Sequence, residues 1–164
     1  MCTVALRLRP ILLALTSMFA AGHAAAQTTT TFNVTGTILP GVCRIAVADV
    51  SLGTYQATLF TGAYASPFQP VNVVVSQCDP LVTRVALRFD GNADTSNAQL
   101  FQGVPGIGIE LQYTSSGARV APGGTAQMAT AAATHAFRAR FVQSRATVSA
   151  GTVSRPITVT MTYN

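Results

Sequence analysis

The sequence predicts an all-β sandwich. Short runs of β-branched and aromatic residues recur along the chain, and clusters of Gly, Pro, Asn, Asp and Ser separate them. The chain also ends on a segment in which apolar and polar residues alternate, which is the period of a half-buried strand. Many short strands with turn signals between them favour a sandwich over an alternating array of strands and helices.

Six segments carry the strand pattern, and turn residues separate them. Asp90-Gly91-Asn92 is one such turn cluster, and Pro122-Gly123-Gly124 is another. The Ala-rich stretch at residues 126–133 has no amphipathic stripe, so we interpret it as a loop or weak strand rather than a helix. In chain order the expected strands are residues 32–45, 68–78, 84–89, 106–113, 135–141 and 157–163.

The last of these segments has the most regular alternation. Its apolar residues point to one face and its threonines to the other. No turn or closing strand follows it in the sequence, so the sheet must leave an unpaired edge beside its core or take a strand from another molecule. We predict that it takes a strand. The apolar face is formed by Ile157, Val159, Met161 and Tyr163, and the opposite face by Thr158, Thr160 and Thr162.

The amino terminus has the pattern of a secretory signal. Arg7 and Arg9 form a basic region, an apolar stretch follows at residues 11–21, and small residues precede Gln27 as at a cleavage site. The apolar stretch is shorter than the roughly 20 residues that a membrane-spanning helix needs. We therefore expect residues 1–26 to be removed between Ala26 and Gln27. An uncleaved membrane anchor is the alternative.

The charge of the mature chain argues against a polyanionic partner. It keeps eight arginines, no lysine and five acidic residues, which is a net charge of +3. The arginines are scattered along the sequence, so neither nucleic acid nor anionic lipid is indicated as a partner. About 138 residues remain, which is enough for one domain with a hydrophobic core.

Two cysteines remain after removal of the signal, Cys43 and Cys78. In an exported protein an isolated pair of cysteines most simply forms a disulfide. A metal site would need more ligands than these two and the single remaining histidine, His135, can supply. We therefore expect a disulfide and neither metal nor cofactor.

Motifs for catalysis are weak throughout the chain. Residues 90–94 imitate the start of a calcium loop, but Thr95 and Phe101 stand where that loop needs Gly and Glu, so we interpret them as a turn. The glycines at 103, 106 and 108 lack the spacing of a dinucleotide fingerprint. There is no nucleophile elbow of the Gly-x-Ser-x-Gly type. We expect no enzymatic activity.

Several local patterns occur together in the mature chain. A Val-x-Gly-x-Ile segment at residues 34–38 precedes Cys43, a Val-x-Leu-Gly step follows at residues 50–53, and a β-run ends at Cys78. Gly151 is fourteenth from the end and Tyr163 is penultimate. This combination, with the signal peptide, resembles the type 1 fimbrial (pilin) subunit family of the chaperone–usher pathway. The resemblance extends over the whole mature chain.

The resemblance implies an incomplete immunoglobulin-like sandwich that lacks its seventh strand, which a donor strand from another subunit completes. Residues 1–26 would be the signal, 27–36 the donor arm and 37–164 the pilin domain. In the arm, one face would insert into a neighbour, and the acceptor groove would lie beside the last strand. The implied donor residues are Thr28, Thr30, Phe32, Val34 and Gly36, and the implied groove residues, which also bind the chaperone, are Gly151, Ile157, Val159, Met161 and Tyr163.

The implied function is that of a structural subunit of a type 1-like fimbria that supports cell adhesion. Its partners would be a periplasmic chaperone, an outer-membrane usher and neighbouring pilins, and it would reach the cell surface through the periplasm. Two close alternatives are a minor or adaptor subunit and a spore-coat-U-like pilus subunit. A monomeric exported β-sandwich that binds a ligand is the alternative from another class, since the arm could supply the missing strand to its own domain.

Overall fold

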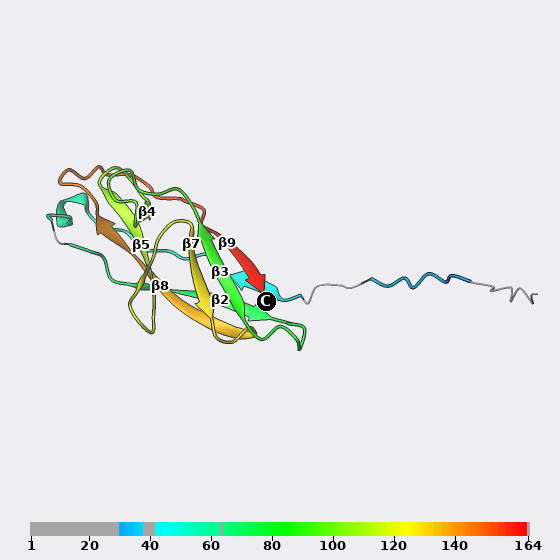
Figure 1. Cartoon of the computed structure of the whole chain (residues 1–164). Coiled ribbons are helices and arrows are strands. Elements are labelled where there is room, and N and C mark those ends of the chain that lie inside the picture. Colours follow the sequence, from blue (N-terminus) through cyan, green and yellow to red (C-terminus); the bar gives the residue numbers. More distant parts are fainter. Residues whose placement is uncertain (1–29, 38–41, 63, 164) are drawn as a thin grey trace, which may run out of the picture. The chain divides into compact units, whose positions relative to one another are not determined.

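The computed structural model describes residues 30–37, 42–62 and 64–163 (Figure 1). The chain divides into two units, Met1–Thr37 and Ile38–Asn164. In the first unit, residues 30–37 have no regular secondary structure. The second unit carries the strands β1 (Arg44–Val47), β2 (Gln69–Ser76), β3 (Val85–Asp90), β4 (Phe101–Gln102), β5 (Ile107–Tyr113), β6 (Arg119–Val120), β7 (Gly124–Met128), β8 (Ala133–Gln143) and β9 (Thr158–Tyr163), and a 3-10 turn, η1, at Ala57–Leu59.

The described strands form two antiparallel sheets. The larger sheet has the order β1-β2-β8-β5-β4, with β6 paired to β5, and the smaller sheet has the order β7-β3-β9 (Figure 1). The predicted all-β, immunoglobulin-like sandwich is thereby confirmed. No helix in the described part of the chain has the length and apolar character that a membrane crossing requires.

The core lies between the two sheets because each strand alternates its side chains. Leu87 and Phe89 of β3 face Val73 of β2 and Phe137 of β8, and all four side chains are buried. The rings of Phe89 and Phe137 meet edge to face, with their centroids 4.8 Å apart. Burial of each such side chain stabilises the domain by about 1.5–3 kcal/mol.

Most of the expected strands are confirmed. The segments at 68–78, 84–89, 106–113, 135–141 and 157–163 correspond closely to β2, β3, β5, β8 and β9. The expectation of one strand over residues 32–45 is wrong, since only Arg44 and Ile45 within it belong to β1 and residues 32–37 are not in a strand. The Ala-rich stretch contributes residues 126–128 to β7 and Ala133 to β8, so the interpretation as a weak strand holds in part.

A buried carboxylate lies on the outer face of the larger sheet. Glu110 of β5 has a side chain only 1% exposed, and it accepts hydrogen bonds from Arg119 of β6 and from Arg140 of β8 at 2.7 Å. Burial alone would raise the pKa of Glu110, but hydrogen bonds from Arg119, Arg140 and Gln112 outweigh burial, and the pKa lies below its ordinary value. The pair of arginines therefore keeps Glu110 ionised.

Candidate functional site

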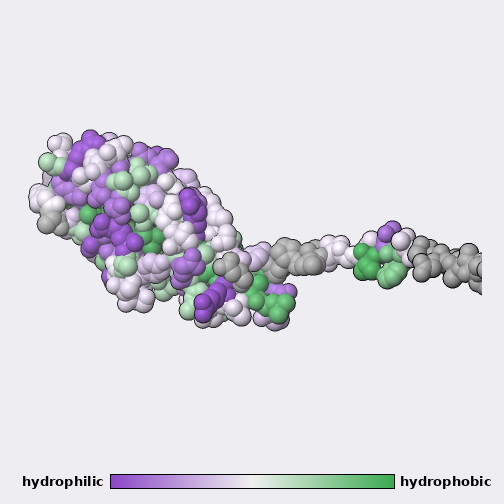
Figure 2. Space-filling view, viewed as in Figure 1, coloured by the Kyte–Doolittle hydropathy of each residue, from purple (hydrophilic) through white to green (hydrophobic). Residues whose placement is uncertain are grey.

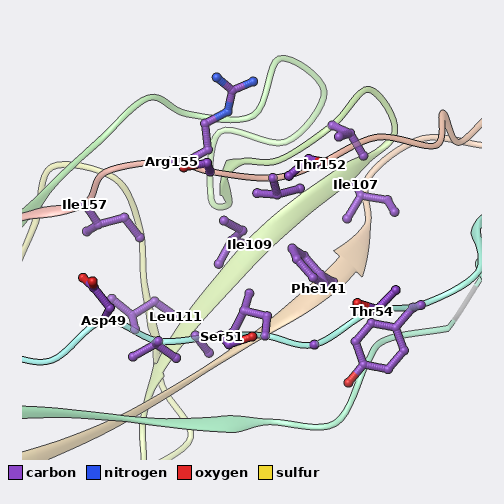
Figure 3. Close-up of a pocket in the computed structure, with 18 of the residues that line it drawn as sticks. Asp49, Ser51, Thr54, Ile107, Ile109, Leu111, Phe141, Thr152, Arg155 and Ile157 are labelled. Carbon is purple, nitrogen blue, oxygen red and sulfur yellow. The ribbon is translucent and has the colours of Figure 1, made fainter.

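A groove of about 910 Å³ opens into the core between the two sheets. Two chain segments border it, residues 47–55 on one side and residues 149–157 on the other, and β5 crosses its floor (Figure 3). Each border comes from a different part of the sequence. The groove therefore exists only in the folded domain.

The floor of the groove is apolar because β5 and β8 turn one face toward it. Ile107, Ile109 and Leu111 alternate along β5 and point to the same side, and Phe141 of β8 lies beside them (Figure 3). Phe89 of β3 closes the floor toward the smaller sheet. Apart from Phe141, which is half-buried, these residues are only 1–7% exposed. The floor therefore belongs to the buried core, and the cavity above it lies between the two borders.

The two borders bring polar residues and non-strand backbone to the rim. Asp49, Ser51 and Thr54 lie along one border, and Thr152 and Arg155 along the other (Figure 3). Within the described residues, neither 48–56 nor 149–157 belongs to a strand, and no β-pairing joins them. Backbone groups in such segments can pair with an inserted extended segment.

The last strand forms one wall of the site. β9 pairs with β3 along one edge, and no described strand pairs with its other edge. Ile157 and Val159 line the groove, whereas Met161 and Tyr163 pack against the core without lining it. The threonines at 158, 160 and 162 are exposed on the opposite face. Of the four apolar residues expected in the groove, the structure therefore brings two into it.

Gly151 also lines the groove, on the border that precedes β9. A Cβ atom at this position would lie 3.1 Å from Cγ1 of Val104, which is closer than side chains normally approach. Glycine thus lets this border pass close to the loop before β5.

The described part of the expected donor arm is exposed. Residues 30–37 form no strand, and the side chains of Phe32 and Val34 are 82% and 86% exposed. Thr30 and Gly36 are exposed as well. The remaining expected donor residue, Thr28, and the expected cleavage residues Ala26 and Gln27 lie outside the described residues. An extended segment with two large exposed apolar side chains is chemically suited to an apolar groove.

The expected disulfide is confirmed. Cys43 and Cys78 are bonded across 35 residues of sequence. Cys43 directly precedes β1 and Cys78 follows soon after β2, so the bond ties together the ends of an antiparallel pair in which Arg44 lies opposite Ser76. It holds β1 at the edge of the larger sheet, next to the start of the groove border.

The polar residues weighed as ligands or catalysts have structural partners. Asp94 accepts hydrogen bonds from the backbone N–H groups of Ser96 and Asn97, at 2.9 and 3.1 Å. His135 lies 3.3 Å from the carbonyl oxygen of Ala131. In the ranges that the structure describes, no group of three His, Cys, Asp or Glu side chains is arranged to hold a metal ion.

Several groove residues were not anticipated from the sequence. The floor residues Ile107, Ile109, Leu111 and Phe141 were expected in strands, but nothing in their alternation tells a core face that borders a cavity from one that is filled. The border at 47–55 carries the Val-x-Leu-Gly step, and that motif was the available signal for it.

A model of the family described as "Fimbrial protein" matches residues 32–164. The chain belongs to the fimbrial protein family. This pilin is similar in structure to the crystal structure of the P pilus rod subunit PapA, with a TM-score of 0.61 and 18% sequence identity, over 84% of this chain and 100% of that one. The resemblance noted in the sequence is thereby confirmed.

A second similar structure is a subunit of a chaperone–usher pilus studied for the uncoiling of its rod. The TM-score is 0.58 and the sequence identity 19%, over 85% of this chain and 97% of that one. At these identities the two likenesses establish the fold. A search among curated protein sequences found no match.

Proposed function

We propose that this pilin polymerises by donor-strand exchange. In this scheme the arm, residues 27–36, inserts into the open groove of a neighbouring subunit and completes its sandwich. The observation that carries the proposal is the groove itself, a cavity with an apolar floor that lies beside an edge of β9 with which no described strand pairs. The family membership supports the role of a structural component of a surface fibre.

The arm and the groove are chemically complementary. Phe32 and Val34 are two residues apart, so an extended arm presents both to one side. Their transfer from water to the floor of Ile109 and Phe141 would contribute about 1.5–3 kcal/mol each. Backbone pairing with the edge of β9 would add to this, and the alternation of the arm would fix its register.

The same groove would require a chaperone and an usher before the subunit is assembled into the fibre. An apolar groove beside an edge strand is an aggregation hazard in a free subunit. We therefore infer that a periplasmic chaperone covers the groove after export and that an outer-membrane usher exchanges the chaperone for the arm of the next pilin. The resulting fimbria would support adhesion at the cell surface.

A variant that carries its own donor tests this proposal. Residues 27–38 are deleted from the amino terminus and appended after Asn164 through a short flexible linker, so that the segment can fold back along β9. We expect a soluble monomer by size-exclusion chromatography with a higher unfolding temperature than the mature chain produced without a chaperone. The matched control carries Phe32→Asp and Val34→Asp in the appended copy and should lose this gain.

The mature chain provides the opposite test. Produced without a chaperone, it should aggregate, polymerise or be degraded. A well-folded monomer, with no gain from the appended segment, would show instead that the arm fills the groove of its own domain. The protein would then be a complete exported binding module.

A further inference from the structure

An exposed apolar patch lies at the end of the domain that holds the loop between β2 and β3. We call it the root patch and define it by Val42, Pro80 and Leu81. The side chains of Val42 and Leu81 are 60% and 87% exposed, and Pro80 is exposed as well. Figure 2 shows an apolar area at this end of the domain, on a face that is otherwise mostly polar or neutral.

The root patch is held in shape by local bonds. The backbone N–H of Asp79 donates to the carbonyl oxygen of Val42 at 2.9 Å, and the N–H of Leu81 donates to Oδ1 of Asp79 at 2.9 Å. The neighbouring disulfide between Cys43 and Cys78 joins the same two segments. These bonds fix the loop with Leu81 exposed to solvent. Little further ordering of the loop would be needed when another surface binds it.

The patch also includes Val42, the first described residue of the domain after the arm. Gly36 is the last residue of the expected donor face, and Val42 follows it by six residues. Six extended residues span at most about 20 Å. A domain of this length has a radius of gyration of about 14 Å, so its diameter is larger than the link. A subunit that held the arm would therefore have the end of its groove within about 20 Å of Val42.

We propose that the root patch packs against the neighbouring subunit whose groove holds the arm, so that each junction in the fibre has a second, apolar contact. The occupant is a second copy of this chain or a subunit like it. The short link keeps the two surfaces at a high effective concentration, which lets a small patch remain in contact. This inference rests on the proposed donor-strand exchange.

Side-chain footprinting with hydroxyl radicals tests the proposal on the unaltered protein. The oxidation rate of Leu81 is measured by mass spectrometry in the chaperone-bound subunit and in the assembled fibre. We expect it to fall by about fivefold in the fibre, as for a residue at the core of an interface. Val74, which is 39% exposed on the outer face of β2, is the matched control and should change little.

A pair of variants measures the consequence for the fibre. Leu81→Ser should still give fibres whose subunits stay joined in SDS without heating, because the donor strand is untouched. Its fibres should be more flexible in electron micrographs, with a persistence length below half that of the native fibre. Val74→Ser should match the native fibre in both respects.

The outcomes separate this inference from the proposed function. SDS-stable fibres in which Leu81 is as reactive as in the free subunit would overturn the root-patch contact alone. Protection of Leu81 already in the chaperone complex would assign the patch to the chaperone and overturn it too. Absence of SDS-stable joining in the native protein would reject donor-strand exchange, and the contact with it.

Discussion

Val159 of β9 lies directly opposite Phe89 of β3, and both residues line the groove. The next residue, Thr160, lies opposite Arg88 and is exposed on the other face of the smaller sheet. Adjacent positions of one strand thus belong to two different environments. This difference allows the groove to be tested with two substitutions that are identical in chemistry.

Val159→Asp is expected to prevent assembly. The new carboxylate would face the apolar floor, and an unpaired buried charge costs several kcal/mol when a partner strand covers it. The subunit should be degraded or absent from the cell surface, as measured by quantitative immunoblotting of sheared surface fibres. Thr160→Asp should assemble near the native level. Equal surface amounts of the two variants would show that this face is not where subunits join.

Deletion of residues 27–34 is expected to separate chaperone binding from polymerisation. The groove remains intact, so the truncated subunit should still purify with its chaperone. It lacks Phe32 and Val34, so it should fail to join the groove of the subunit before it. Co-purification and an assembly assay with native subunits measure the two properties. If the truncated subunit no longer bound the chaperone, the arm would be part of the domain's own fold.

Replacement of Cys43 and Cys78 by serine is expected to destabilise the domain. Closing a loop of 35 residues stabilises a fold by about 4 kcal/mol in the chain-entropy model. The bond also fixes β1 at the sheet edge, so the double variant should accumulate poorly after export. Mass mapping of the native protein should find the two cysteines linked. Two free thiols in the exported protein would contradict this prediction.

Glu110→Gln is expected to lower the stability of the domain. It should also reduce the loss of stability that occurs on acidification. The side chain is buried against Arg119 and Arg140, and loss of its charge should cost about 2 kcal/mol, below the value for a fully buried pair because both arginines are partly exposed. The lowered pKa means that Glu110 stabilises the native state above its ordinary value of 4.5 and loses this effect as the pH falls through the folded pKa.

Chemical denaturation at neutral pH and at about pH 3 measures this effect, since the two conditions lie on either side of the carboxyl pKa range. The native domain should lose more stability on acidification than the Glu110→Gln variant does. Asp90→Asn removes an exposed pair with Arg88 at 2.9 Å and should change stability by about 0.5 kcal/mol or less. An equal acid response of native protein and the Glu110 variant would assign the acid sensitivity to other groups.

The sequence predicted the parts of the fold that depend on local alternation. The strands around Phe89, Phe137 and Val159 repeat with period 2, and one buried face imposes that period. Short or irregular pairings were missed, among them β4 and β6, because two-residue strands depend on their neighbours rather than on their own sequence.

The site could be predicted only in part, for the same reason. The alternation at 157–163 predicted the wall formed by Ile157 and Val159. It did not distinguish these two residues from Met161 and Tyr163, which pack on the core without lining the groove. Whether Ile109 faces a cavity or a filled core depends on which segments pack over it. This is a tertiary property that local alternation does not encode. Residues 48–55 of the border have no strand pairing in the described structure, so a short motif was the only sequence signal for this border.

Photo-cross-linking from position 32 tests the central claim most directly. Subunits with a benzophenone amino acid in place of Phe32 are assembled together with isotope-labelled native subunits, and the cross-linked peptides are identified by mass spectrometry. Donor-strand exchange predicts attachment to groove residues such as Ile109, Phe141 or Ile157 of a labelled subunit. Attachment confined to the unlabelled chain that carries the probe, or to surfaces outside the groove, would contradict it.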